Sequence, residues 1–244
     1  MVAAKSRTRH DCHVHRLLRI LSTALITAGL VVLADVVATL VWQEPVSRVY
    51  ATIKQNQAED ELAALESRFP TRADLRKTAQ APRLRGKVRI LAGLFDDRVN
   101  LGEAIGRIAI PTIDLDTVVV QGTRTGDLQR GPGHYPETAF PGEGKTVAFA
   151  GHRTTYLAPF RHLDKLESGD EIVLEMPYAN FTYRVQKIRV VDPSDVQIVH
   201  DTGYERLVLT ACHPLYSATQ RIAAFAKLEQ VSFFAIGNRR WEDP

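Results

Sequence analysis

Cysteine is scarce in this chain of 244 residues, which contains only Cys12 and Cys212. So few cysteines exclude a disulfide-stapled scaffold, and no C-x-x-C or H-x-x-x-H spacing is present to bind structural zinc. The sequence therefore predicts neither a metal nor another cofactor. It also leaves Cys212 as a thiol that needs a separate explanation.

A strong excess of one charge is also missing. Lysine and arginine total 31, while aspartate and glutamate total 28, which gives a formal net charge of +3. This small surplus, together with the lack of a groove-reading motif, argues against nucleic acid as a partner. With 45% hydrophobic and 24% charged residues, the chain has enough apolar content for one compact domain with an additional segment.

The longest apolar stretch covers residues 17–42 and is interrupted by Arg19 and Asp35. About 20 apolar residues suffice to cross a bilayer. Residues 1–16 carry four basic residues against one acidic residue, so they are expected to form a cytoplasmic segment, followed by a transmembrane anchor over 17–42. Asp35 would cost about 2.5–3.5 kcal/mol at the bilayer centre, but it lies closer to Trp42 and the outer headgroups.

A cleaved signal peptide is the alternative for this stretch, because Val36-Val37-Ala38 offers small residues of the kind that signal peptidases cut. The length of the run and Trp42, a typical interfacial residue, favour the uncleaved anchor. Either interpretation exports the C-terminal part, and the anchor predicts a single-pass membrane protein with an extracellular domain. Cys12 and Cys212 then lie on opposite sides of the membrane and cannot form a disulfide.

Residues 43–103 are expected to form a stalk and a linker. Helix formers predominate from Glu44 to Phe69, and apolar residues recur there at spacings of three or four among many charges, which predicts an amphipathic helical stalk. The apolar positions are Val46, Val49, Ile53, Leu62 and Leu65. Residues 70–102 are rich in arginine and punctuated by proline and glycine, with little periodicity, so a loosely attached linker is expected there.

Short β-favouring runs separated by glycine and proline follow from about residue 104 and predict a catalytic domain over 104–244. The candidate strands are Gly106–Pro111, Leu115–Gly122, Thr146–Ala150, Glu171–Met176, Phe181–Val191, Arg206–Ala211, Ile222–Ala226 and Val231–Ile236. Phe181–Gln186 alternates cleanly between apolar and polar residues, as a strand with one buried face does. Only a brief helix is expected, around 158–165. This pattern predicts an all-β domain, a closed or nearly closed β-barrel with short helices.

Cys212 is the strongest chemical candidate, because it stands at the end of one strand candidate. Pro214 removes a backbone donor soon after it, and Arg221 begins the next apolar run, so a hairpin would set Cys212 beside Arg221 at one rim of the sheet. Free cysteine is most often a small buried residue. A lone exported thiol at a strand end near a cation has, instead, the surroundings that stabilise a thiolate.

A nucleophilic cysteine needs a histidine to hold or transfer a proton. His152 is the best placed, since it follows the strand candidate ending at Ala150, and Gly151 lets the backbone turn sharply there. His213 is adjacent to Cys212, and neighbours on an extended segment point to opposite faces, which makes it a poorer partner. The other histidines of the domain lie in loops without a supporting pattern: His134, His162 and His200.

Arg221 completes the candidate set. A guanidinium stays charged and donates hydrogen bonds in a fixed fork, which suits the negative oxygen of a tetrahedral acyl intermediate. Each of the two partners also has an ordinary explanation, because His152 can be a surface histidine and Arg221 a solvated arginine at a strand start.

These residues resemble the sortases, membrane-anchored cysteine transpeptidases of Gram-positive bacteria. The resemblance covers about residues 104–236 and is carried by Ala150-Gly151-His152-Arg153, by Leu209-Thr210-Ala211-Cys212 and by the arginine nine positions after the cysteine. Further stretches resemble the class E branch, typical of actinobacteria: Tyr135-Pro136-Glu137-Thr138, Gly151–Tyr156, Pro159-Phe160 and Trp42-Gln43-Glu44-Pro45. Ala211 departs from the threonine or other small residue of many relatives, without touching the catalytic triplet.

The resemblance implies an eight-stranded sortase-like barrel in which Cys212, His152 and Arg221 are catalytic. It further implies cleavage of an LPXTG-like or LAXTG-like sorting signal between threonine and glycine through a thioacyl intermediate. The donors would be secreted proteins with C-terminal sorting signals, and the acceptor would be a peptidoglycan precursor amine or a pilin lysine. His152 would act as acid and then base, while Arg221 would stabilise the oxyanion.

Two other functions remain open from the sequence. One is a thiol protease that only hydrolyses its acyl intermediate, and the other is a non-catalytic, membrane-anchored β-barrel that binds partners. A ligated product in the presence of an amine separates the transpeptidase from the protease. Scattered positions of Cys212, His152 and Arg221 would favour the binding protein.

Overall fold

The computed structural model describes residues 7–42 and 45–233, with the backbone alone for 7–14, 39–42, 45 and 46. The chain divides into two compact units, Met1–Pro45 and Val46–Pro244. Parts of the sequence predictions lie outside the described residues. They are residues 1–6 of the N-terminal segment, the side chains of Cys12 and Trp42, positions 43 and 44, and the end of the last strand candidate at 234–236.

The first unit consists of helix α1, Arg7–Trp42. Within it, His15–Ala38 is long and apolar enough to cross a membrane. Its side chains from His15 to Val37 are exposed, and the large apolar ones find no buried environment within the unit. The apolar N-terminal helix expected from the sequence is therefore present.

The second unit contains a closed barrel of eight strands, as expected from the sequence, with neighbours in the order β1-β2-β3-β4-β7-β8-β6-β5. The strands are β1 Ala104–Ile110, β2 Leu115–Gln121, β3 Gly133–His134, β4 Thr146–Ala150, β5 Glu171–Met176, β6 Ala179–Val191, β7 Arg206–His213 and β8 Gln220–Ser232. Short helices lie in the connections: η1 Pro111–Ile113, α5 Thr125–Leu128, η2 Leu163–Lys165 and η3 Val196–Val199.

Two strand predictions were wrong in detail. The segment around Gly133, expected to be a loop, forms β3, a two-residue strand that joins β2 to β4. The last two candidates form one strand, β8, because it pairs along its length with the 13-residue β6. A strand as short as β3 carries no detectable period-2 pattern, and continuous pairing overrides a local break in apolar character.

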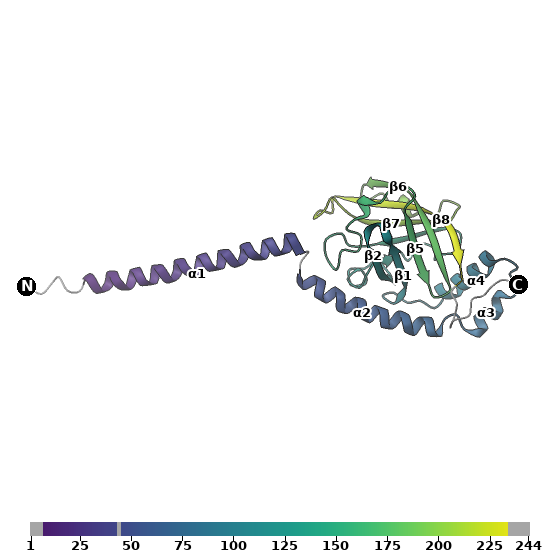
Figure 1. The fold of residues 1–244 in the computed structure, drawn as a ribbon, viewed down its shortest axis with the longest axis horizontal. Helices are drawn as coiled ribbons and strands as arrows, with labels where there is room; N and C mark the ends of the chain where they lie inside the picture. The colour runs from purple at the N-terminus through teal and green to yellow at the C-terminus, as the bar shows by residue number, and fades with distance from the viewer. Residues whose placement is uncertain (1–6, 43–44, 234–244) are drawn as a thin grey trace, which may run out of the picture. The chain divides into compact units, whose positions relative to one another are not determined.

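Helix α2, Pro45–Arg68, is present as expected, but it packs against the barrel and is not a separate stalk (Figure 1). Its buried face consists of Ala51, Gln55, Ala58 and Leu62, whereas the large apolar residues Val49 and Ile53 are exposed. The sequence prediction was correct for Leu62, which is buried, and for Leu65, which packs against the core, but wrong for Val49 and Ile53, because the rest of the docking face is made of small residues and a glutamine. Such a face has little hydrophobicity to detect.

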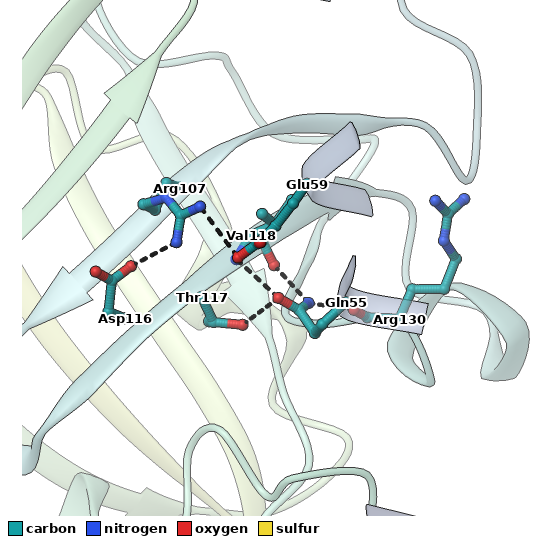
Figure 2. A network of polar contacts seen from close by, with 7 residues as sticks. All are labelled: Gln55, Glu59, Arg107, Asp116, Thr117, Val118 and Arg130. Carbon is teal, nitrogen blue, oxygen red and sulfur yellow. Dashed lines mark hydrogen bonds and ion pairs between the residues drawn. The ribbon is translucent and has the colours of Figure 1, made fainter. Parts of the chain in front are cut away.

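Gln55 fastens α2 to the barrel, because its side chain makes hydrogen bonds to β2 that a neighbouring strand would otherwise make. Val118 in β2 lies where β3 is too short to pair with it. The Gln55 side chain bonds the Val118 backbone instead: Nε2 donates to the carbonyl at 3.1 Å, and Oε1 accepts from the N–H at 3.0 Å. Thr117 also donates to Oε1, and Nε2 donates to the carbonyl of Arg130. Figure 2 shows these bonds beside the Glu59–Arg107–Asp116 ion pairs.

Residues 70–102, expected to form a loose linker, contain two docked helices, α3 Arg72–Thr78 and α4 Leu84–Asp96. The buried residues of α4 are Val88, Leu91, Ala92 and Phe95, an i, i+3, i+4, i+7 pattern that Gly86 and Gly93 obscure in the sequence. They belong to the main hydrophobic core together with residues inside the barrel. The linker prediction was therefore wrong, because this segment helps to build the core.

Side chains of the central strands alternate between two apolar groups. Leu207, Leu209 and Ala211 of β7 point into the main core, whereas Val208 belongs to a separate cluster on the outer face with Ala148, Ala223 and Phe225. The alternation follows from the pleat of a strand, in which successive side chains point to opposite faces. The outer face of β4, β7 and β8 is thus apolar and partly covered, by Tyr135, Ile198 and Val199.

Candidate active site

The predicted site residues lie on β7, on β8 and just after β4, which are three neighbouring strands of the barrel. Cys212 on β7 pairs directly with Arg221 on β8, so the hairpin expected from the sequence forms. On the other side of β7, the parallel register pairs Ala150 with Thr210, and the Gly151 N–H donates to the Thr210 carbonyl at 3.0 Å. His152 lies two residues beyond this paired register, next to Arg153, whose side chain contacts the segment of Cys212.

Cys212 and Arg221 also belong to the outer face. Counting by twos from Val208 reaches Cys212, and counting back from Ala223 reaches Arg221. His152 follows the end of β4, on the other side of β7.

Cys212 is a free thiol with intermediate burial. The loop that follows it, residues 214–219, turns back to Arg221, whose Nη1 donates to the carbonyls of Ala218 at 2.9 Å and Gln220 at 3.0 Å. These bonds use one nitrogen of the guanidinium and fix the side chain against its own loop. The remaining N–H groups of the fork are left to bind an oxygen.

His152 is partly buried, and its Nε2 is a buried atom with no hydrogen-bond partner among the described residues. Burial lowers the pKa of the His152 imidazole below its ordinary value, because the charged form loses hydration. Gly151 is needed here for a different reason from the predicted sharp turn: a Cβ on it would lie 2.5 Å from the ring of Phe160. The ring packs beneath the backbone that presents His152.

Arg153 joins the segment of His152 to that of Cys212. Its side chain is only 2% exposed and forms an ion pair with Asp164 at 2.9 Å. Nη1 lies 3.0 Å from Nδ1 of His213 and makes a long, weak contact of 3.5 Å with the Cys212 carbonyl, while Nε donates to the Arg161 carbonyl at 3.2 Å. Arginine only donates, so Nδ1 of His213 is the acceptor and carries no proton.

The other histidines of the domain have structural surroundings or lie apart from Cys212. His134 is fully buried, its Nδ1 lies 2.8 Å from Oε1 of Gln121, and burial lowers its pKa to about 4. His213 is engaged by Arg153, in agreement with its expected poor position. His200 follows η3, and its carbonyl accepts from Thr146 and Arg206. Within residues 7–42 and 45–233, no group of three or more His, Cys, Asp or Glu side chains is placed to hold a metal ion.

A cavity of about 860 Å³ lies between the β3–β4 connection and η3. Residues 135–139 form one wall and Val196, Val199, His200 and Asp201 the other. Tyr135, at its edge, shares a 2.9 Å hydrogen bond between its hydroxyl and that of Thr210, two residues before Cys212 on the same face. Cys212 does not line the cavity, which therefore extends the outer face away from the thiol.

The sortase domain family matches residues 108–229, half of the chain and almost the whole barrel. The chain belongs to the sortase family. Members of this family are cysteine transpeptidases, and the eight-stranded barrel agrees with the family match.

Individual relatives show the same family. A sortase D of Bacillus subtilis is 38% identical over 116 residues, which make up 46% of this chain and 56% of that protein. The structure of sortase E1 from Streptomyces coelicolor, solved with a tripeptide in the active site, has a TM-score of 0.53 at 28% identity and covers 57% of this chain and 95% of that one. Sortase E of Streptomyces avermitilis has a TM-score of 0.51 at 32% identity over 57% of this chain and 97% of that one. This sortase chain spans about half the length of the curated relatives it matches.

Sequence reasoning predicted the pairing of Cys212 with Arg221 but missed side chains that surround the candidate site. Arg153 and Tyr135 stood in stretches that were singled out, yet a buried arginine and a tyrosine–threonine bond have no periodic signature. The contribution of α2 was missed as well, because the bonds of Gln55 to the barrel join residues more than 60 positions apart in the sortase chain.

Proposed function

We propose that this sortase is a membrane-anchored transpeptidase in which Cys212 is the nucleophile, His152 the acid and base, and Arg221 the donor to the oxyanion. The observation that carries the proposal is the direct pairing of Cys212 on β7 with Arg221 on β8, beside the end of β4 from which His152 follows. A non-catalytic binding barrel gives no reason for this grouping.

The reaction proceeds in two steps. The Cys212 thiolate attacks the threonine carbonyl of an LPXTG-like or LAXTG-like signal, a thioester forms, and the Thr–Gly bond breaks as His152 protonates the leaving glycine amine. An amine of a cell-wall precursor or a pilin lysine then attacks the thioester. His152 takes its proton, and the thiolate leaves. Arg221 donates to the carbonyl oxygen whenever that oxygen is negative.

The cavity beside Tyr135 supports a place for the donor. It continues the outer face beyond Thr210 and is lined by both apolar and polar residues, as an extended peptide requires. We assign the residues of the signal that precede the scissile bond to this side of Cys212. The tripeptide in the active site of the Streptomyces coelicolor sortase E1 is consistent with a peptide ligand.

The anchor is proposed on chemical grounds as well. His15–Ala38 is long enough to span a bilayer, and the four basic residues within 1–16 favour residues 1–16 in the cytoplasm, 17–42 in the membrane and the barrel outside. A cleaved signal sequence is the competing arrangement. N-terminal sequencing of the protein recovered from membranes distinguishes them, because only the anchor retains residues 1–38.

Peptide cleavage with and without an amine acceptor tests the function. Wild-type chain should release the C-terminal fragment, and added amine should divert the other product into a ligated peptide. Cys212→Ala should lose cleavage. Hydrolysis alone, unaffected by amine, would indicate the thiol protease, and undiminished cleavage by Cys212→Ala would remove Cys212 as the nucleophile. Because thiolate and imidazolium must coexist, the rate should be bell-shaped in pH, and a monotonic rise from pH 5 to 10 would contradict the pair.

A further inference from the structure

The loop that carries His152 has an unusual backbone. Tyr156, Leu157 and Ala158 adopt φ values of 50°, 64° and 44°, three consecutive non-glycine residues in the left-handed region. Each such residue costs of order 1 kcal/mol and persists only where the surrounding structure holds it. The Ala158 N–H donates to the Thr155 carbonyl at 2.8 Å, and the Phe160 N–H donates to the His152 carbonyl at 3.0 Å. The loop therefore folds back onto His152.

Tyr156 joins this loop to α2 and to the end of α5. Its ring lies 5.2 Å from the imidazole of His152, centroid to centroid, and 6.3 Å from the ring of Tyr50 in an edge-on contact. Gln129, just after α5, donates from Nε2 to the Tyr156 hydroxyl at 3.1 Å. The imidazole is thus backed by a tyrosine that is itself fixed from two sides.

Tyr50 belongs to α2, outside the barrel and outside the region that matches the sortase domain family. Lys54, one turn later, lies 5.6 Å above the Tyr50 ring, and Gln55 fastens the helix to β2 directly after it. The docking that Figure 2 shows therefore holds Tyr50 at the His152 loop.

We propose that α2 is a working part of the active site, in which Tyr50 supports Tyr156 and Tyr156 positions the imidazole of His152. Both tyrosines are positioning residues, since neither touches the reacting atoms. The inference rests on the proposed role of His152. It gives α2 a function in the reaction beyond that of a spacer between membrane and barrel, because a change in its docking alters the placement of His152.

Variants of the full chain in detergent test the proposal. Tyr50→Ala should lower kcat about 3- to 10-fold with little change in KM, the loss of one aromatic contact of about 0.5–1.5 kcal/mol. Tyr156→Ala should have the larger effect, and Tyr50→Phe should retain activity because the ring remains. Val49→Ala is the matched control, since Val49 is the preceding residue on α2 and is 63% exposed.

A second readout does not depend on turnover. Tyr50→Ala and Tyr156→Ala admit water to His152, so its pKa, followed by NMR of the imidazole protons, should rise towards the ordinary value of about 6.5. The nearby cations Arg153 and Arg221 are unchanged in these variants. This measurement separates the two proposals. If the wild type is inactive but the His152 pKa rises in the two variants, the positioning of His152 by Tyr156 and Tyr50 is supported and the proposed transpeptidase function is wrong.

Gln55→Met tests the same coupling from a distance. It removes the bonds to Val118 and should lower kcat, and the Tyr50→Ala/Gln55→Met double variant should be no worse than the more damaging single variant. Limited proteolysis reports whether α2 has undocked. Full activity with α2 undocked, or a Tyr50→Ala variant with unchanged kcat and unchanged His152 pKa, would overturn the proposal.

Discussion

The two ends of the barrel differ in how they are filled. Where β7 begins, five aromatic rings contact one another at centroid distances of 5.2 to 6.3 Å: Phe69, Phe95, Phe140, Tyr178 and Phe181. We call this the aromatic end. Where β7 ends, at the candidate site, Cys212, His152 and Arg221 are each only partly buried. The aromatic end is densely packed around its rings and encloses the Glu205 carboxylate, which accepts from the Tyr183 hydroxyl, whereas the other end keeps polar groups accessible.

The difference separates stability from chemistry. Close-packed aromatic side chains contribute mainly to the free energy of unfolding, while accessible polar groups held by their neighbours contribute mainly to catalysis. Changes at the aromatic end should therefore alter stability at constant activity per folded molecule, and changes at the site should do the reverse.

Phe95→Ala should have the largest effect. Phe95 is 1% exposed and contacts three other rings, so its truncation should lower the free energy of unfolding by about 3–5 kcal/mol. Urea unfolding measures this loss, with Val49→Ala as a surface control on another helix. Unchanged stability would show that α4 is not part of the core. A large loss of kcat in the remaining folded protein would contradict the claim that the aromatic end contributes to stability and not to catalysis.

Arg221→Ala should come next and act on the rate. Loss of an oxyanion donor costs about 2.7–4 kcal/mol, or 10²- to 10³-fold in kcat, while the partly exposed side chain leaves stability within about 0.5 kcal/mol. Arg189→Ala is the matched control, an exposed arginine on the adjacent strand β6. Equal activities of the two variants would exclude Arg221 from the reaction.

The comparison also shows what the sequence can reveal. The pairing of Cys212 with Arg221 was predictable, because a strand end, a proline and a following arginine define a hairpin locally. The aromatic end was not, because Phe95 and Phe69 lie in a segment read as a stalk and linker, and their partners Phe140 and Tyr178 are more than 40 positions away. Gln55 was missed for a similar reason, since its value depends on the shortness of β3.

Arg153→Met should have an intermediate effect that combines both properties. It leaves the Arg161 carbonyl and His213 Nδ1 without their donor and removes a buried cation. We expect kcat/KM to fall about 10- to 100-fold, that is about 1.4–2.8 kcal/mol. The alkylation rate of Cys212 should change in parallel, because the Cys212 segment loses its tie to His152. Asp164→Asn, at the exposed side of the pair, should be much milder, and full activity of Arg153→Met would contradict this role.

Asp74→Asn should have the smallest effect and be confined to stability. Two hydrogen bonds from Arg98, at 2.6 and 2.8 Å, hold the pKa of the Asp74 carboxyl well below its usual range. Since Arg98 is 45% exposed, the loss at pH 7 should be about 1–2 kcal/mol. The folded state favours the ionised Asp74 carboxylate. Its contribution to the free energy of unfolding is therefore present above the unfolded pKa of about 3.9 and declines as the pH falls below that value. Unfolding at pH 7 and pH 3 measures the decline, and a difference between wild type and Asp74→Asn that stays constant would contradict it.

The central claim is that Cys212 forms the acyl intermediate at the open end of the barrel. Intact-mass spectrometry of the full chain mixed with a sorting-signal peptide tests it directly. The account predicts an added mass equal to the peptide up to its threonine, less one water, located on Cys212, absent in Cys212→Ala and discharged into a ligated product by an amine. Turnover of the peptide with the adduct on another residue would contradict the account. So would an adduct that forms equally in Cys212→Ala.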